Sequence, residues 1–306
     1  MIKQSFDLDW EYSEASGMMA QFFAQWQPVN LPHDAMIAKP RAASNPSSSH
    51  GGYFPGNVAN YRKKFLVPEE WRGQSVQLEF EGVYMNAEVT INRQLLRLQP
   101  YGYTSFVVDI TSALAYGQEN EVVVSANTTA QPNSRWYSGT GIYRHVWLRR
   151  GGDVHIQPQG VFVTTPVVDP TVSVVQIATE LASLSESYEG ATLRTTILNG
   201  EGTEVAQTET PLKGFSVQQT LLVKNARLWS VDEPYLYTLL SEVLLGDAVV
   251  DTETTTFGIR SISVDAQNGF RLNGVPLKLK GAVYITIMVH WVLPATTVPK
   301  SAKSNC

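Results

Sequence analysis

The chain has 306 residues, of which 43% are hydrophobic and 17% are charged, which is enough for two domains with separate cores and excludes disorder throughout. Its formal net charge of −5 provides no broad cationic field, so we expect neither nucleic acid nor a membrane as a partner. Residues 1–7 lack the apolar core of a secretory signal, and no segment reaches the roughly 18–20 apolar residues of a membrane span. As written, the sequence is expected to stay in the cytoplasm.

Cysteine and histidine usage gives no support to a metal site. Cys306 is the only cysteine, so neither an intrachain disulfide nor a Cys-based zinc site can form. The histidines lack the close pairing of a helical metal motif. No metal or cofactor is predicted, and each of the five is expected to be structural or exposed: His33, His50, His145, His155 and His290.

Alternation of apolar and polar residues predicts strands in the first 150 residues, at 76–80, 87–91 and 122–126. Short apolar runs at 106–108 and 146–148 predict two more. Together they indicate one all-β unit. The residues that we expect in its core are Val76, Leu78, Phe80, Val89, Ile91, Val122 and Val124.

Two stretches of this unit break the alternation. Residues 39–60 are rich in Pro, Ser, Gly and Asn, cannot bury a face, and are predicted to form a long surface loop. Residues 13–24 are the one place where a short helical turn is expected.

After residues 151–152 (GG) the alternation restarts, and about seven short strands over roughly a hundred residues predict an immunoglobulin-like sandwich. Residues 199–200 (NG) are a hairpin turn signal. A second boundary at 257–260 precedes a predicted hairpin at 270–281, with residues 273–274 (NG) at its turn and a further strand after it. The runs that we assign to strands of the sandwich are 161–163, 172–178, 193–198, 215–222 and 235–243.

Several runs, in this order along the chain, resemble glycoside hydrolase family 2 of the β-galactosidase type. The resemblance covers residues 5 to about 284. Its motifs are 29–34 (VNLPHD), 51–56 (GGYFPG), 61–65 (YRKKF), 80–87 (FEGVYMNA), 100–106 (PYGYTSF), 131–147 (QPNSRWYSGTGIYRHVW), 228–230 (LWS) with 234–237 (PYLY), and 257–260 (FGIR).

The resemblance implies an all-β chain: a jelly-roll sugar-binding domain at 1–152, an immunoglobulin-like β-sandwich at 153–259, and at 260–284 the start of a (β/α)₈ barrel. In the family, the barrel carries the acid/base and nucleophile glutamates of a retaining glycosidase. A barrel takes about 250 residues, whereas 47 residues follow Ile259 and none after Asp265 is acidic. We therefore assign no catalytic residue and expect this chain, truncated at the start of the barrel, to be inactive alone.

In the family, the Trp-Tyr-Ser-Gly loop of the jelly roll helps to shape the subsite for the terminal sugar. The resemblance thus makes Arg135, Trp136 and Tyr137 candidate substrate-binding residues, because a guanidinium fork and aromatic faces suit sugar hydroxyls and ring faces. An equal alternative is that Trp136 and Tyr137 are core or interface residues. Better-known branches carry an acidic residue where Arg135 stands, so their sugar preference does not transfer. Four carboxylates are expected to be exposed or capping: Asp34, Glu81, Glu88 and Asp109.

Three departures from the family's motifs indicate relaxed constraint. Many relatives have Ile-Asn-Gly at a tight turn where this chain has Arg93, and glycine accepts a positive φ without penalty. Relatives also often have Trp where Ala35 stands, and glycines where Asn57 and Val58 stand. Each change weakens the local preference for a turn or the local packing of side chains.

Two other functions stay open. A standalone carbohydrate-binding protein would keep the jelly roll and end cleanly near Arg260, whereas an immunoglobulin-like adhesion protein is disfavoured by the specific motif series. The expected partner in the leading hypothesis is a carbohydrate, a β-galactoside or related glycoside. Relatives are often periplasmic, so localisation stays open, as does the oligomeric state.

Beyond Tyr284 the sequence departs from its relatives, which continue with His-His-Asp-Asn-Gly-Ala-Leu-Gly-Ala-Ala. Residues 285–294 (ITIMVHWVLP) can be encoded by codons that translate to that string once one nucleotide is restored in front. We therefore expect 285–306 to be an out-of-frame tail, poorly packed or prone to aggregate. Sequencing the gene tests this, because restoring one nucleotide near codon 285 must reopen a frame that encodes a barrel.

Overall fold

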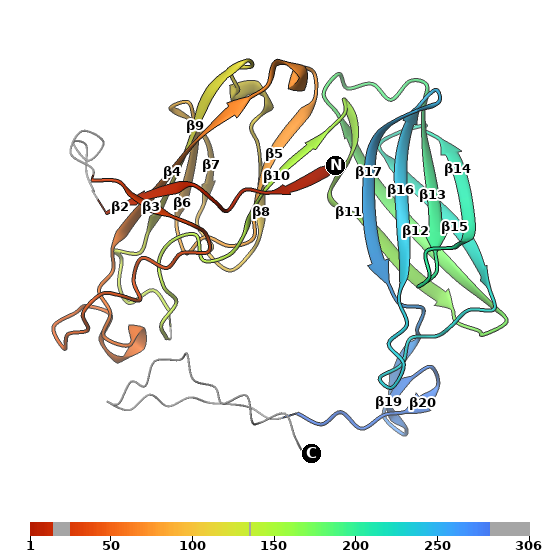
Figure 1. The fold of residues 1–306 in the computed structure, drawn as a ribbon. Helices are drawn as coiled ribbons and strands as arrows, with labels where there is room; N and C mark the ends of the chain where they lie inside the picture. The colour runs from red at the N-terminus through yellow and green to blue at the C-terminus, as the bar shows by residue number, and fades with distance from the viewer. Residues whose placement is uncertain (15–24, 135, 282–306) are drawn as a thin grey trace. The chain divides into compact units, whose positions relative to one another are not determined.

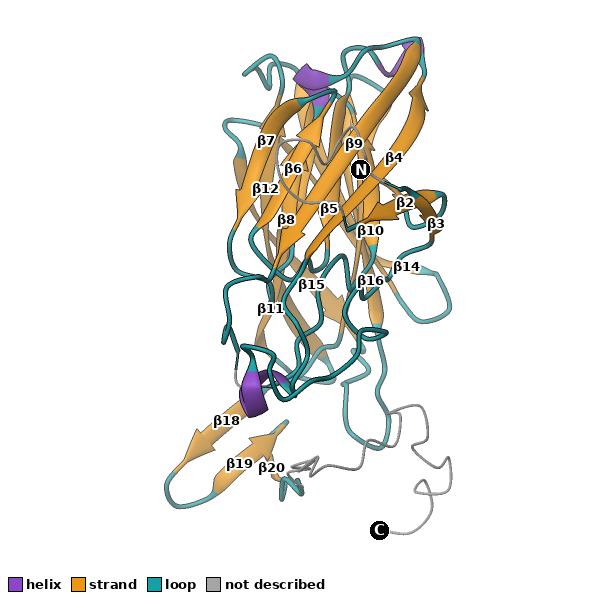
Figure 2. Cartoon of the chain, turned by 90° about the vertical axis from the view of Figure 1, so that its left-hand side faces the viewer, coloured by secondary structure: helices purple, strands orange, loops and turns teal. Residues whose placement is uncertain are grey.

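The computed structural model describes residues 1–14, 25–134 and 136–281, and these form β-strands, loops and three short 3₁₀ helices (Figures 1 and 2). The 3₁₀ helices are Ser48–Gly51, Glu69–Trp71 and Thr111–Ala113. The predicted all-β class is thus confirmed. Residues 1–260 make one compact unit, and a second unit begins at Ser261. Within the described residues, no helix has the length and apolarity that crossing a bilayer requires.

The first sandwich, residues 1–151, pairs two antiparallel sheets. The four-stranded sheet has the order β1-β10-β5-β8 and the six-stranded sheet the order β3-β2-β4-β9-β6-β7. The strands of the smaller sheet are β1 (Ile2–Ser5), β10 (Val146–Gly151), β5 (Ser75–Phe80) and β8 (Phe106–Asp109). Those of the larger sheet are β3 (Gln27–Val29), β2 (Trp10–Ser13), β4 (Val58–Val67), β9 (Gln118–Asn127), β6 (Ala87–Ile91) and β7 (Gln94–Gln99).

The core of the first sandwich is the one that the alternation predicts. All seven expected residues are fully buried. The register pairs Leu78 with Leu148 in one sheet and Val89 with Val124 in the other, so the apolar residues of neighbouring strands share a face. A slip of one residue would turn every one of these side chains toward solvent.

The second sandwich, residues 154–257, has seven strands and is the predicted immunoglobulin-like one. Its sheets have the orders β11-β12-β15 and β14-β13-β16-β17. The first sheet consists of β11 (Val154–Val167), β12 (Val172–Ser183) and β15 (Ser216–Lys224), and the second of β14 (Glu204–Pro211), β13 (Ala191–Leu198), β16 (Tyr237–Leu245) and β17 (Ala248–Phe257). The domain boundaries at 152 and 259 stay a prediction.

Two corrections concern strands of the sandwiches. The loop predicted at 39–60 ends earlier, because Val58 begins β4 and Asn60 pairs with Ser125; the polar composition of the window hid a strand start. The alternation does not predict strands β14 and β17. They form the two edges of their sheet and are rich in Thr and Glu, so they lack the continuous apolar alternation of a central strand.

The second unit contains a small antiparallel sheet of order β18-β19-β20. Asn273 and Gly274 form its turn with φ of 50° and 78°, as the Asn-Gly signal predicts. The strands are β18 (Ile262–Asp265), β19 (Gly269–Leu272) and β20 (Val275–Pro276). The sequence pattern does not predict β18. Most of the expected helical turn (15–24) and the expected out-of-frame tail lie outside the described residues.

Charged residues join the two sandwiches. The Arg149 guanidinium, whose side chain is 3% exposed, donates to Glu79 Oε2 at 2.8 Å and to Glu253 Oε2 at 2.9 Å. Lys3 Nζ lies 3.2 Å from the same Glu79 oxygen. Burial opposes ionisation of Glu79, but the hydrogen bonds from Arg149 and Lys3 outweigh it and hold the pKa of this carboxyl below its usual range.

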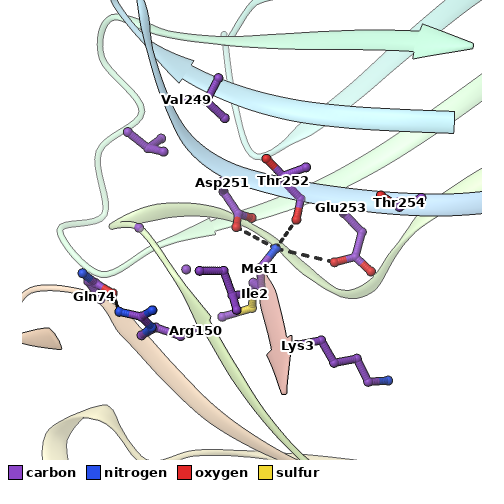
Figure 3. Close-up of a pocket in the computed structure, with 13 residues that line it drawn as sticks. Met1, Ile2, Lys3, Gln74, Arg150, Val249, Asp251, Thr252, Glu253 and Thr254 are labelled. Carbon is purple, nitrogen blue, oxygen red and sulfur yellow. Dashed lines mark hydrogen bonds and ion pairs between the residues drawn. The ribbon is translucent and has the colours of Figure 1, made fainter. Parts of the chain in front are cut away.

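A cavity of about 790 Å³ lies beside this junction, where the end of β10 and the start of β1 face β17. Figure 3 shows the Met1 nitrogen directed at Asp251 and Glu253, and it lies 2.6 Å from Asp251 Oδ1. Arg150 and Val249 are also part of the lining (Figure 3). These contacts belong to the packing of the two sandwiches.

Candidate functional site

The loop between β9 and β10 carries the candidate residues. Trp136 is 40% exposed and Tyr137 is half-buried. Arg135 lies outside the described residues. Of the described pair, Trp136 is the side chain that the loop presents to solvent.

Asp34, which is distant in sequence, fixes this loop. Its Oδ1 accepts hydrogen bonds from the backbone N–H groups of Thr140 at 3.0 Å and Met36 at 2.9 Å, and its Oδ2 accepts one from the Tyr137 hydroxyl. Burial and this hydrogen bond raise the pKa of Tyr137. Gly139 has a φ of +74°, and a Cβ there would stand 2.8 Å from Asp34 Oδ2, so the close approach requires glycine. Asp34 is therefore a positioning residue for the loop.

The ring of Tyr137 is packed from the side by the loop that precedes β4. Its centroid lies 4.7 Å from that of Phe54, and the Arg41 guanidinium stands 5.6 Å from the Phe54 centroid. Arg41 is itself held, because its Nε donates to the Gly52 carbonyl at 2.8 Å. The space left between these loops is about 20 Å³, room for a single water molecule. Tyr137 thus anchors the loop beneath Trp136.

Hydrogen bonds also fasten the loop to a third segment, between β7 and β8. Ser138 Oγ lies 2.6 Å from the Tyr103 hydroxyl and donates to Ser134 Oγ at 2.9 Å. Tyr103 and its neighbour Tyr101 are both more than half exposed. Sequence reasoning did not place either tyrosine at the site, although the motif that contains them was recognised.

The other carboxylates have local roles. Asp109 caps the following turn by accepting from Thr111 N–H at 2.9 Å, and Glu81 accepts from Trp147 Nε1 at 2.9 Å. Glu88 is exposed on β6. In the part of the chain that the structure describes, no group of three His, Cys, Asp or Glu side chains is arranged to hold a metal ion.

Four of the five histidines are described. Three are hydrogen-bonded through Nδ1 and the fourth is exposed, whereas His290 lies outside the described residues. Burial lowers the pKa of His33. The arrangements are His33 to the Tyr61 hydroxyl at 2.9 Å, His145 to Asp7 Oδ2 at 2.7 Å, His155 to the Asp153 carbonyl at 3.0 Å, and exposed His50.

Comparison with known families decides what these sandwiches are. Residues 29–151 match the galactose-binding domain-like model of glycosyl hydrolase 2, and residues 154–260 match the model of glycosyl hydrolases family 2. The chain belongs to glycoside hydrolase family 2. Its first sandwich is the galactose-binding-like domain of the family and its second the immunoglobulin-like domain.

Curated relatives and a solved structure match most of the chain. A β-galactosidase of Bacteroides ovatus is 41% identical over 91% of this chain, and a β-glucuronidase of Bacteroides fragilis is 30% identical over 73%. The crystal structure of a family 2 member from Bacteroides cellulosilyticus superposes with a TM-score of 0.83 at 34% identity, covering 92% of this chain. The chain spans only 34%, 34% and 38% of these three proteins, respectively.

Proposed function

We propose that this chain forms the non-catalytic β-domains of a family 2 glycosidase that acts on β-galactosides. In this proposal Arg135 and Trp136 supply one wall of the subsite for the terminal sugar, and Tyr137 holds the wall in place. The observation that carries it is the exposed indole of Trp136 on a loop that Asp34 fixes by two hydrogen bonds, from the Tyr137 hydroxyl and the Thr140 N–H. An aromatic face held rigidly at the surface suits the apolar face of a sugar ring.

The hydrolytic step is assigned to the parent enzyme's barrel. A retaining glycosidase needs two carboxylates about 5–5.5 Å apart, one to protonate the leaving oxygen and one to attack the anomeric carbon. Near the candidate loop, Asp34 already accepts three hydrogen bonds from protein groups. Purified chain is therefore expected to show no measurable hydrolysis of aryl β-galactosides, β-glucuronides or β-mannosides. Turnover that survives extensive purification and responds to mutation within this chain would overturn the proposal.

Sugar binding is expected to be weak, because the loop is only one side of a pocket. Calorimetry with galactose at tens of millimolar should show little or no heat, whereas tight binding would favour the standalone carbohydrate-binding protein. Saturation-transfer NMR detects weaker contacts. Galactose should give a saturation-transfer signal with the unmodified chain and none with Trp136→Ala. A titration of glucuronate beside galactose tests the galactoside assignment, and a preference for glucuronate would overturn it.

A further inference from the structure

The segment between β7 and β8 places two exposed tyrosines next to each other. Tyr101 is 59% exposed and Tyr103 is 52% exposed, and their ring centroids lie 5.6 Å apart with the planes at 65°. No hydrogen bond to the Tyr101 hydroxyl is found among the described residues. The pair therefore offers aromatic faces together with a hydroxyl that can still donate and accept.

The backbone that carries these rings is firmly held. Gly102, between the two tyrosines, is buried against Tyr84: a Cβ at this glycine would stand 2.5 Å from the Tyr84 ring. Its carbonyl accepts a hydrogen bond from the Tyr143 hydroxyl at 2.8 Å. The ring of Tyr103 also packs on that of Tyr84, with 5.1 Å between centroids. The tyrosines are thus exposed without being loose, which lowers the entropy that a ligand must remove on binding.

The tyrosine pair is continuous with the candidate loop. The Tyr103 hydroxyl and Ser138 Oγ lie 2.6 Å apart, and the same Ser138 oxygen lies 3.2 Å from the Trp136 carbonyl oxygen. Tyr103 therefore connects the loop that carries Trp136 to the segment between β7 and β8 that carries Tyr101. Exposed aromatic side chains therefore stand on both of the segments that meet at the contact between Tyr103 and Ser138.

We infer that Tyr101 and Tyr103 form a second sugar-stacking surface, so that the site takes a saccharide of at least two hexopyranose rings. The inference rests on the proposed function for the first ring, at Trp136. The second ring would stack its C–H face on the tyrosines and exchange hydrogen bonds with the Tyr101 hydroxyl.

The test compares a monosaccharide with a disaccharide on the full chain. Methyl β-galactoside and lactose are titrated by saturation-transfer NMR against the unmodified chain, Tyr101→Ala and Trp136→Ala. Phe162→Ala serves as the control, because Phe162 is a 67% exposed aromatic residue of the second sandwich. Circular dichroism of each variant verifies the fold.

Lactose should bind about three- to tenfold more tightly than methyl β-galactoside. Tyr101→Ala should remove this advantage and leave the monosaccharide unchanged, Trp136→Ala should weaken both ligands, and Phe162→Ala should weaken neither. An advantage of lactose that persists in folded Tyr101→Ala overturns the tyrosine surface alone. Unchanged binding of both ligands to Trp136→Ala overturns the proposed function, and absence of binding by both ligands to the unmodified chain overturns both proposals.

Discussion

The Tyr137 hydroxyl donates a hydrogen bond to the Asp34 carboxylate, which lies 103 positions earlier in the chain. The same carboxylate accepts from the N–H groups of Thr140 and Met36. Asp34→Ala leaves three donors without this partner, whereas Tyr137→Phe removes one bond. We expect losses of unfolding free energy of about 2–3 and about 1 kcal/mol, respectively, measured by urea denaturation.

A double-mutant cycle controls this prediction. Because both substitutions remove the same hydrogen bond, the double variant should lose less stability than the sum of the single variants. Strict additivity would show that the contact between Tyr137 and Asp34 contributes nothing measurable.

The turn between β6 and β7 carries a conformational penalty at Arg93. Asn92 and Arg93 have φ of 49° and 70°, the left-handed region that a two-residue hairpin of this type requires. Asn92 is compensated, because its amide donates to Asn120 Oδ1 at 2.7 Å and to the Ala113 carbonyl at 2.9 Å. Arg93→Gly should therefore raise the unfolding free energy by about 1 kcal/mol in thermal or urea denaturation.

Arg97, in the strand β7 that follows this turn, provides the matched control. Arg97→Gly should lower stability by about 0.5–1 kcal/mol, because glycine in a strand loses more backbone entropy on folding. If Arg93→Gly destabilised the chain as much as Arg97→Gly, the positive φ of Arg93 would not determine the effect of this substitution on the unfolding free energy.

The sequence predicts best what depends on local alternation. Val76, Leu78 and Phe80 are buried because every second residue of a strand shares a face, and this pattern can be read without a structure. The intervening Gln77 and Glu79 have the polar character of solvent-facing residues, yet both are buried. For Glu79, the cause is a salt bridge with Arg149, which itself reaches the second sandwich, and such a partner 70 positions away leaves no local pattern.

The candidate site was predictable in part for the same reason. Trp136 and Tyr137 were found through a motif, whereas the contacts that give them different surroundings come from segments far along the chain. Asp34 appeared as an ordinary capping carboxylate, and Tyr103 as part of a recognised run. Their convergence on one loop is a product of the tertiary fold, which alternation and spacing do not encode.

Asn57 stands at the end of the loop before β4. Both polar atoms of its side-chain amide are buried, and neither has a hydrogen-bond partner. A buried polar group without a partner costs about 1–3 kcal/mol. We therefore expect Asn57→Ala to raise the unfolding free energy by about 1 kcal/mol in chemical denaturation.

Asn45, in the same loop, is the control, because its Nδ2 donates to the Tyr53 carbonyl at 2.8 Å. Asn45→Ala should lower stability by about 1 kcal/mol. A loss of stability in Asn57→Ala comparable to that in Asn45→Ala would contradict the prediction and show that the Asn57 amide is satisfied in solution.

The ion pairs of Glu79 predict how stability depends on pH. Because the folded-state pKa of Glu79 is lowered, its ionised form contributes stability that is present above the unfolded pKa of about 4.3 and is lost as pH falls through the folded pKa. Glu79→Gln should therefore be less stable than the unmodified chain at pH 7, and the difference should shrink between about pH 5 and pH 3. Urea denaturation at a series of pH values measures this difference, and Glu88→Gln, at an exposed position of β6, should show almost none of it. Arg149→Met should cost more, about 3–5 kcal/mol at pH 7, because it leaves the buried Glu79 carboxylate and the partly exposed Glu253 carboxylate without their guanidinium. A Glu79→Gln difference that stays constant from pH 7 to pH 3 would mean that the charge of Glu79 does not stabilise the junction between the sandwiches.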